Sequence, residues 1–434
     1  MCVHHLINTQ AAAPPTDVFT AFGLGLNPRG PIDLVVDNAG ATYMTGNVPN
    51  GVTIVSIKDV GSYRPLGKGD VWVGRVTPQG NNSWATFFGG PELEEARAVA
   101  VDADSVFVTG VFQSPNFNMG GVLYRPASTT AFDVYVARLN ATNGRVIWGR
   151  TFGGESIENV VSITAAHGVA YVAGTFQSAA MQLGSTTLAN PNAATGGNSS
   201  FLVAYDYSGA LVSADAYGDM QTLWRMARDS KTGVVVFMGT DYVSRPGSSW
   251  RTSLGSSSAT DTRRGLALDM ASQSVFVAAP FTGASITLGS ATLTNTGAAT
   301  SFDSYVAKLH AATGEVVWAR RIGSTGQDYV VNIAADGAGG VYSAGTFERA
   351  LVLPEPFLVT SQGAADIFVL RHAGSGNVIG AWAFGSTNAE MLFDLALDRF
   401  GGVYLTGTLR GWVTFGSNSV QQQFVARAIT VRSY

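Results

Sequence analysis

Residues 133–177, DVYVARLNATNGRVIWGRTFGGESIENVVSITAAHGVAYVAGTFQ, decide the fold, because their apolar residues alternate in four short runs. We expect strands at residues 134–139, 145–152, 160–165 and 169–176, each closed by Gly or Asn punctuation. The runs are rich in Val, Ile, Tyr, Phe and Thr, which suit a pleated, half-buried surface. We expect these four strands to form one antiparallel sheet.

The last of these strands carries a signature that recurs along the chain, an aromatic residue followed closely by Gly or Ala. It is found at Tyr43, Phe107, Tyr171, Phe237, Phe276, Tyr342 and Tyr404. The intervals are about 62–66 residues, except for one of about 40 between Phe237 and Phe276. Such a period marks a repeat architecture. The sequence predicts an all-β fold, a seven-bladed β-propeller of four-stranded antiparallel blades.

Two places depart from the repeat. Blade four is predicted to be shortened, with a thin third strand near residues 242–245. Blade seven ends without an outer strand, whereas residues 17–25 resemble an outer strand that precedes blade one. We therefore expect residues 18–24 to pair with residues 424–429, which closes the ring and removes an exposed sheet edge. The domains are then a disordered extension at residues 1–16 and one propeller over residues 17–434.

Several features repeat at fixed places in the predicted blades. An Asp ends most of the strands that precede the aromatic anchors, and we expect it to cap a tight turn. Trp residues recur in the outer strands, where packing against the next blade is the simplest role and stacking of a sugar or flat cofactor is the alternative. Short hairpins are expected within inserts at residues 181–188, 286–293 and 413–420, all on one face of the ring.

Acidic residues recur eight positions before the strand-end Asp or its equivalent, namely Glu94, Glu158, Asp261, Asp328 and Glu390. In a closed ring they would circle one mouth of the channel, on the hairpin-bearing face. Converging carboxylates repel one another unless a cation, a cationic ligand or hydrogen bonds compensate them. These five are therefore candidates for binding a ligand or a cation such as Ca²⁺; the alternative is that each caps its own loop. No catalytic residue is predicted.

The order of the strings Asp-x-[Tyr/Phe]-Val-Ala-[Arg/Lys]-Leu, Gly-x-Val-x-Trp, Phe-Gly-Gly and Val-Tyr-x-x-Gly-x-Phe resembles the SBBP class of seven-bladed propeller repeats, over roughly residues 17–430. That resemblance implies a propeller, often secreted or surface-associated, without an assigned enzymatic activity.

Residues 136–148 and 306–318 also look like the tryptophan-docking motif of quinoprotein propellers. Those enzymes commonly use a vicinal cysteine pair against pyrroloquinoline quinone, and this chain has one cysteine, Cys2. We therefore expect no cofactor, apart from the Ca²⁺ considered above.

Composition narrows the function classes. The formal net charge is −4 and 13% of the residues are charged, which argues against a nucleic-acid partner. No apolar run is long enough for a membrane-spanning helix, and the opening lacks a signal-peptide pattern. Three glycosylation acceptor patterns, at Asn81, Asn140 and Asn198, favour secretion or the cell surface.

The sequence thus predicts a monomeric, non-enzymatic interaction scaffold that binds a protein or glycan through its hairpin-bearing, acidic face. The alternative is a carbohydrate-active or quinone-dependent enzyme that uses the channel mouth.

Overall fold

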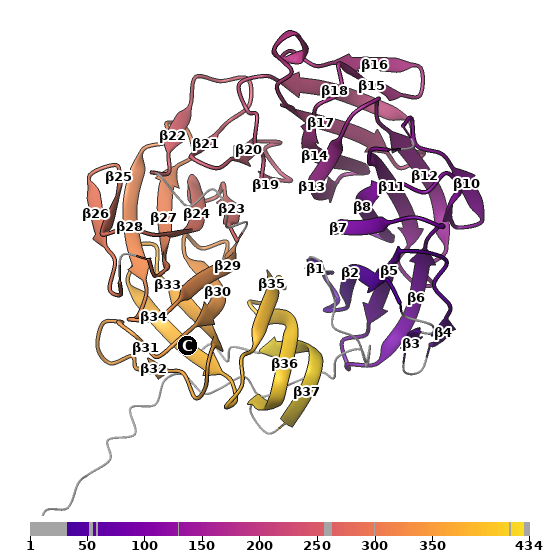
Figure 1. Cartoon of the computed structure of the whole chain (residues 1–434). Helices are drawn as coiled ribbons and strands as arrows, with labels where there is room; N and C mark the ends of the chain where they lie inside the picture. The colour runs from indigo at the N-terminus through magenta and orange to yellow at the C-terminus, as the bar shows by residue number, and fades with distance from the viewer. Residues whose placement is uncertain are drawn as a thin grey trace, which may run out of the picture.

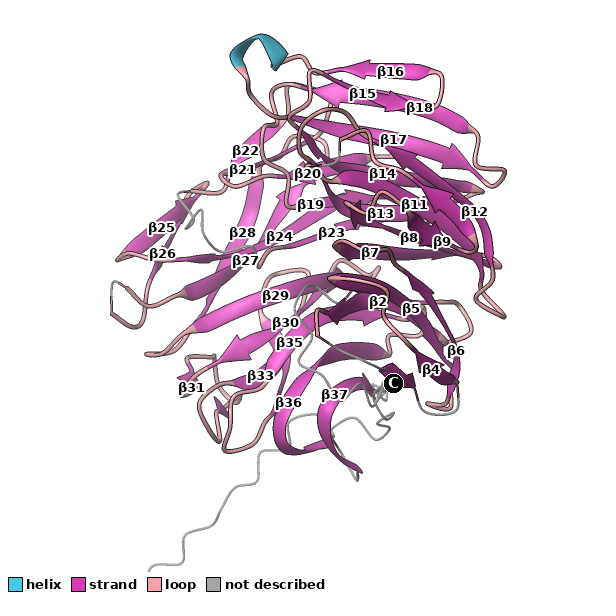
Figure 2. Cartoon of the chain, turned by 45° about the vertical axis from the view of Figure 1, so that its right-hand side comes forward, coloured by secondary structure: helices cyan, strands magenta, loops and turns pink. Residues whose placement is uncertain are grey.

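The computed structural model describes residues 33–51, 55–57, 60–128, 130–255, 263–298, 300–415 and 418–428. Over these ranges the chain is built from β-strands, with one short 3₁₀ helix, η1 (Ala193–Thr195), at the outer edge beyond β16 (Thr186–Ala189) (Figure 2). No helix in the described ranges is long and apolar enough to cross a membrane. The predicted N-terminal extension, residues 1–16, lies outside them.

The strands pair into six four-stranded sheets and one three-stranded sheet, all antiparallel. We number these blades along the chain and list their strands from the centre outward. Blade 1 contains β1 (Asp33–Val36), β2 (Thr42–Pro49), β5 (Gly69–Val76) and β6 (Asn82–Phe88). Blade 2 contains β7 (Glu94–Asp102), β8 (Ser105–Phe112), β11 (Asp133–Asn140) and β12 (Val146–Phe152). Blade 3 contains β13 (Glu158–Ala166), β14 (Val169–Phe176), β17 (Ser199–Asp206) and β18 (Leu211–Tyr217).

The remaining blades follow the same order. Blade 4 contains β19 (Arg225–Arg228), β20 (Val235–Met238), β21 (Tyr242–Ser244) and β22 (Arg251–Ser253). Blade 5 contains β23 (Gly265–Asp269), β24 (Ser274–Phe281), β27 (Asp303–His310) and β28 (Val316–Ile322). Blade 6 contains β29 (Asp328–Ala335), β30 (Val341–Phe347), β33 (Asp366–His372) and β34 (Val378–Phe384). Blade 7 contains β35 (Met391–Leu397), β36 (Val403–Phe415) and β37 (Asn418–Ala428).

The blades stand side by side around a centre (Figure 1). Each first strand contacts the first strand of the next blade, in the order β1, β7, β13, β19, β23, β29 and β35, and β35 contacts β1. The second strands, such as β8 and β24, are buried along their whole length because both faces pack against neighbouring blades. Four-stranded antiparallel sheets set radially around a centre are the architecture of a β-propeller.

Small hairpins are inserted between the second and third strands of five blades and lie at the periphery (Figure 1). They are β3 (Val55–Ile57) with β4 (Gly61–Tyr63), β9 (Phe117–Met119) with β10 (Val122–Tyr124), β15 (Ala180–Leu183) with β16, β25 (Ser285–Leu288) with β26 (Ala291–Thr294), and β31 (Ala350–Leu351) with β32 (Val359–Thr360). In blade 7 the insert continues β36 and β37, with Val413 opposite Val420. The three hairpins predicted from the sequence are thereby confirmed.

One prediction about strand pairing is wrong. The four strands of residues 133–177 do not form one sheet, because β11 and β12 belong to blade 2 whereas β13 and β14 belong to blade 3. The Gly153-Gly154 turn carries the chain from the outer strand of one blade to the inner strand of the next. The alternation of apolar residues indicates where strands lie and which side chains share a face, but it does not indicate which strands pair with one another.

Blade 4 is shortened as predicted. Its third strand, β21, is three residues long and falls within the expected residues 242–245, and β22 is equally short. The expected closing strand at residues 18–24 lies outside the described residues. Its expected partner, residues 424–429, belongs to β37, whose backbone is described as far as Ala428.

The repeated Trp side chains connect neighbouring blades. Trp84, Trp148 and Trp318 are 6–8% exposed, and each indole Nε1 donates to a backbone carbonyl of the next blade. Trp148, for example, donates to the carbonyl oxygen of Tyr207 at 2.9 Å. Buried indoles need such an acceptor, so these residues pack and orient blades and are not free to stack a ligand.

Candidate functional site: buried carboxyl groups at the blade junctions

The acidic residues predicted at one channel mouth occupy equivalent places in their blades. Glu94, Glu158 and Asp328 open β7, β13 and β29, and Glu390 directly precedes β35. These four side chains are no more than 1% exposed. Asp261 lies outside the described residues. The structure thus places the four described candidates beneath the loops that enter the innermost strands.

Each of these carboxylates accepts hydrogen bonds from the loops around it, either the loop that enters its strand or the loop that follows the second strand of its blade. The Glu158 Oε2 accepts the backbone N–H of Gly154 at 3.0 Å, and its Oε1 accepts the Ser178 hydroxyl at 2.5 Å. The other three accept equivalent bonds: Glu94 from the N–H of Ser114, Asp328 from the N–H and hydroxyl of Ser324, and Glu390 from the N–H and hydroxyl of Ser386. A carboxylate that satisfies buried donors in this way stabilises the loop around it.

Beside each of these four acidic side chains lies a second buried carboxyl group. From the sequence, this second group was treated only as the start of a strand. Asp70 of β5, Asp133 of β11, Asp303 of β27 and Asp366 of β33 are no more than 3% exposed. Asp70, Asp133 and Asp303 each raise the pKa of the acidic counterpart in the next blade. Asp366 shares a hydrogen bond with its counterpart, Glu390. The junctions of blades 1–2, 2–3, 5–6 and 6–7 therefore each contain a pair of acidic side chains.

The Phe-Gly-Gly motif leaves room for this pair. A Cβ atom added to Gly153 would lie 2.2 Å from the Asp133 Cγ, and one added to Gly154 would lie 2.5 Å from the Ser178 Cβ. The backbone of Gly153 is also paired with Gln182 of the hairpin β15–β16. The same close approach recurs at Gly89, Gly323 and Gly385, which face Asp70, Asp303 and Asp366. The Gly that directly follows each of these outer strands was the sequence signal that could have revealed the second carboxyl group.

Burial controls the ionisation of these groups. It raises the pKa of Glu94 and of Glu158 to about 7, and the pKa of Asp133, Asp328 and Asp366 to about 6. The neighbouring acid raises the pKa of Glu94, Glu158, Asp328 and Asp366 further, whereas hydrogen bonds from the loops lower it. The Oδ1 atoms of Asp70, Asp133, Asp303 and Asp366 are buried without a hydrogen-bond partner. A proton held by one member of each pair relieves the repulsion between the two carboxylates.

The innermost strands carry a second polar layer, four residues before the strand-end Asp, that sequence reasoning missed. At this level Asn332 donates its amide to the Asp394 Oδ1 at 2.5 Å, and the N–H of Leu34 donates to the Asp394 Oδ2 at 2.9 Å. The Asp33 Oδ2 accepts the N–H of Val99 at 2.8 Å. These bonds join blades 6, 7, 1 and 2 across their inner strands.

Asp33 and Asp394 form an asymmetric pair within this layer, because the equivalent positions in the other blades hold Ala98, Ser162, Arg225, Gly265 and Asn332. Burial, with the Asp394 carboxylate beside it, raises the pKa of Asp33 well above its usual range. Burial also raises the pKa of Asp394, although Arg225 opposes the rise. The Asp33–Asp394 pair thus departs from the repeat symmetry that the acidic pairs at the blade junctions follow.

Across the described part of the chain, no group of three or more His, Cys, Asp or Glu side chains could hold a metal ion. Two carboxylates with hydrogen-bond donors already on two or three of their oxygens also provide fewer ligands than the six to eight oxygens that Ca²⁺ takes. The geometry at the junctions suits proton uptake and loop capping.

Searches for similar proteins give fold neighbours only. No protein-family model matches the chain, and no curated protein matches it. Among solved structures, it is similar to a europium-containing methanol dehydrogenase, with 11% identity over 95% of this chain and 93% of that one and a TM-score of 0.42. It is also similar to the WD40 β-propeller domain of Doa1, with 11% identity over 96% and 99% of the two chains and a TM-score of 0.40. BamB from Moraxella catarrhalis aligns with 12% identity over 96% and 99% of the chains and a TM-score of 0.30.

Proposed function

We propose that this chain is a seven-bladed propeller of the SBBP type that acts as a non-enzymatic binding scaffold for a protein or glycan. The observation that carries the proposal is that the four described acidic candidates are buried and hydrogen-bonded to loops of their own blade junctions. These carboxyl groups stabilise the blade junctions, so the ligand binds to the exposed surface that covers them. Repeat symmetry supports this role, because a catalytic pair needs two groups with different environments.

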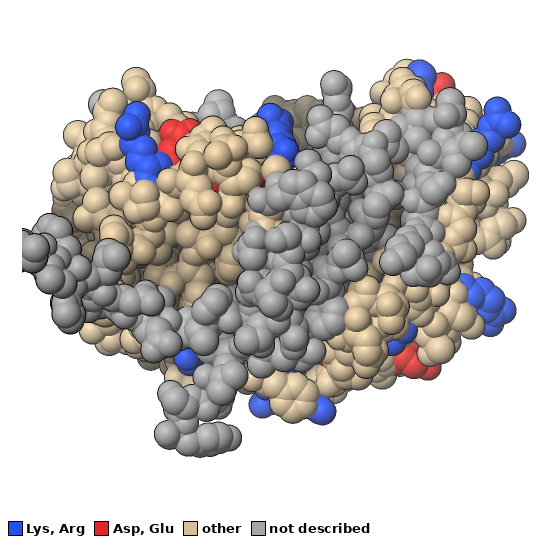
Figure 3. Space-filling view, turned by 90° about the horizontal axis from the view of Figure 1, so that it is seen from below, with Lys and Arg blue, Asp and Glu red and all other residues tan. Residues whose placement is uncertain are grey.

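The binding surface in this proposal is the hairpin-bearing face. Five large apolar side chains in the inserts are more than half exposed, namely Leu66, Val122, Leu123, Val352 and Leu358. Leu358, at 80%, is the most exposed of the large apolar residues described. Among the described residues in the side view of Figure 3, charged side chains are few, in keeping with the low charge of the chain. Exposed apolar side chains on a weakly charged surface suit a protein partner better than a nucleic acid.

Photo-crosslinking tests this surface. With p-benzoylphenylalanine at Leu123 or at Leu358, we expect both positions to capture the same partner from the native host. The same group at Ile147, an exposed apolar residue of the outer strand β12, should not capture it. Capture of that partner at Ile147 alone would contradict the proposed face.

A thermal-unfolding screen separates the scaffold from the alternative, a carbohydrate-active or quinone-dependent enzyme. The observation that favours the enzyme is the asymmetric pair Asp33 and Asp394. A ligand that binds only the folded state raises the melting temperature by mass action. We expect Ca²⁺, chelator and pyrroloquinoline quinone each to leave it unchanged. A saturable rise with quinone, or a rise with one glycan that Asp394→Asn abolishes, would favour the enzyme. A rise with Ca²⁺ that chelator reverses would identify the acidic residues as a cation site.

Closure of the ring is part of the proposal. Within the described residues β37 pairs only with β36, so blade 7 has an edge on which residues 18–24 would form the fourth strand. Burial of Val18, Phe19, Phe22 and Leu24 is a gross gain of roughly 1.5–3 kcal/mol each.

Deletion of residues 1–25 is therefore expected to yield an aggregation-prone protein that unfolds at least about 10 °C below the full chain. Differential scanning fluorimetry with light scattering measures both properties. Deletion of residues 1–16 alone is the control and should change neither. A protein without residues 1–25 that melts like the full chain would refute the closure.

A further inference from the structure

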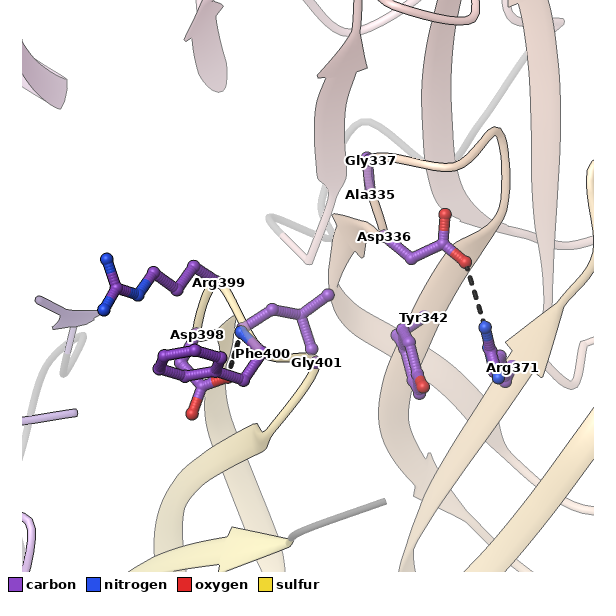
Figure 4. Close-up of a pocket in the computed structure, with 10 residues that line it drawn as sticks. Ala335, Asp336, Gly337, Tyr342, Arg371, Asp398, Arg399, Phe400 and Gly401 are labelled. Carbon is purple, nitrogen blue, oxygen red and sulfur yellow. Dashed lines mark hydrogen bonds and ion pairs between the residues drawn. The ribbon is translucent and has the colours of Figure 1, made fainter. Parts of the chain in front are cut away.

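A pocket of about 320 Å³ lies between blades 6 and 7 (Figure 4). Blade 6 contributes residues 335–337, Tyr342 and Arg371, and blade 7 contributes residues 397–401. The pocket lies where the innermost strands β29 and β35 end, whereas the hairpins follow the second strands, so it is at the end of the ring opposite the hairpins. The volume is enough for one small ligand.

Tyr342 lines this pocket and has a hydroxyl group without a protein partner. Its side chain is 2% exposed, and the hydroxyl makes no hydrogen bond with any residue that the structure describes. The Arg371 guanidinium lies 5.4 Å from the centre of the ring, and the close-up shows Tyr342 between Arg371 and the turn of blade 7. A buried hydroxyl without a partner costs free energy, so a ligand that bonds to it is favoured.

Blade 1 contains the same three side chains with their bonds complete. There the Tyr43 hydroxyl donates to the Asp37 Oδ2 at 3.1 Å and accepts the N–H of the Arg75 Nε at 3.2 Å. In blade 6 the Asp336 Oδ2 instead accepts an Nη of Arg371 at 3.3 Å, and the Arg371 Nε is buried without a hydrogen-bond partner among the described residues. The ion pair of blade 6 therefore occupies the carboxylate oxygen to which the tyrosine of blade 1 donates.

The Tyr342 hydroxyl is also separated from the turn of blade 7. At the next junction around the ring, the equivalent hydroxyl of Tyr404 donates to the carbonyl oxygen of Gly40 at 3.5 Å. The residues equivalent to this pair are Tyr342 and Gly401. Both line the pocket, and they face each other across the open space in Figure 4. A ligand that bridges them has to donate a hydrogen bond to a carbonyl group and also bond to a hydroxyl group.

The formal charges around the pocket cancel. Two acidic and two basic side chains line it, namely Asp336, Asp398, Arg371 and Arg399. Asp336 is paired with Arg371, and the Asp398 Oδ1 accepts two N–H groups of its own turn. Two apolar side chains, Ala335 and Leu397, are half-buried in the wall. Because there is no net charge to attract an ion, the pocket favours an uncharged ligand with both hydroxyl groups and a C–H face.

We propose that this pocket binds one neutral monosaccharide. The sugar hydroxyl groups bridge the Tyr342 hydroxyl of blade 6 and the Gly401 carbonyl of blade 7, and the C–H groups of the sugar pack on Leu397. A sugar suits these partners because each of its hydroxyl groups can donate one hydrogen bond and accept others. The site lies apart from the hairpin-bearing face and does not depend on the partner proposed for that face.

Saturation-transfer NMR on the full chain tests the proposal with D-glucose, D-galactose, D-mannose and D-xylose. We expect at least one of them to bind saturably with a Kd of about 0.5–10 mM, the range for a ligand of this size. Cyclohexanol has a ring of similar size but a single hydroxyl group, so it should bind at least about fivefold more weakly. No saturable binding of any of the four sugars, or equal affinity of cyclohexanol, would overturn the proposal.

Removal of one hydroxyl group locates the site. Tyr342→Phe is expected to weaken binding of the sugar about fivefold or more and to leave the melting temperature unchanged, because this hydroxyl has no partner among the described residues. Tyr43→Phe is the matched control. It should leave the Kd of the sugar unchanged but lower the melting temperature by about 2 °C, since the Tyr43 hydroxyl bonds to Asp37 and Arg75. Sugar binding that Tyr342→Phe leaves intact, or that Tyr43→Phe weakens equally, would contradict the proposed site.

Discussion

Replacement of Gly153 by alanine is expected to lower the free energy of unfolding by about 3 kcal/mol or more. The new Cβ atom would lie 2.2 Å from the Asp133 Cγ, a separation that real structures do not tolerate. Neither partner can move freely, because the Gly153 carbonyl accepts the N–H of Gln182 and the Asp133 Oδ2 accepts the N–H of Ala127. Urea unfolding followed by fluorescence measures the loss.

Gly197→Ala is the matched control for this substitution. The nearest atoms to a Cβ atom at Gly197 are 3.3 Å away, so the change should stay within about 1 kcal/mol. A double-mutant cycle with Asp133→Ala isolates the contact, since the Gly153→Ala penalty should shrink once the carboxyl group is absent. If Gly153→Ala and Gly197→Ala unfold at the same urea concentration, the close packing of glycine and carboxyl group is refuted.

The second large effect concerns pH. We expect the protein to melt higher at pH 5.5 than at pH 8, by roughly 5 °C. The buried carboxyl groups have a folded-state pKa of about 6 to 7, above the value of about 4 that they have in an unfolded chain. The folded state thus holds more protons in this interval. The stability is fully present near pH 4 and is lost as the pH rises through 6 and 7.

One buried group opposes this trend. Burial lowers the pKa of His372 to about 4, so its contribution falls as the pH drops below about 6.5. Five carboxyl groups with raised pKa values of 6 to 7 outnumber it, and the net slope follows the carboxyl groups.

Glu158→Gln tests the assignment of the pH effect. Glutamine resembles the protonated acid and can donate to Ser178, so this variant should melt higher than the wild type at pH 8 and show a smaller change between pH 5.5 and 8. Glu155→Gln, at an exposed site close by, is the control and should keep the wild-type slope. A melting temperature that rises with pH over this interval would contradict raised pKa values at the junctions.

Local patterns in the sequence predicted the strands well, because the formation of a strand depends on residues that are neighbours in the sequence. The strands at residues 133–177 lie within two residues of their predicted ends, and the three-residue β21 falls where a weak strand was expected. Pairing was harder. Asp133 and Glu158 are 25 residues apart and sit in different blades, so alternation could not show that they share one buried site.

The candidate site was predicted in position but not in environment. The spacing from the strand-end Asp identified Glu94, Glu158, Asp328 and Glu390 as equivalent. Their burial could not be seen, because it depends on Ser114, Ser178 and the Gly residues of separate loops. Asp33 and Asp394 were missed since they lie at opposite ends of the chain.

Hydrogen exchange at residues 18–24 tests the central claim, a propeller ring closed by its own N-terminal strand, most directly. Pairing with β37 predicts that alternate amides of this segment exchange as slowly as those of residues 423–428, under conditions where the ring stays folded. Exchange of residues 18–24 at the rate of an unfolded peptide, with the other blades still protected, would contradict the closure.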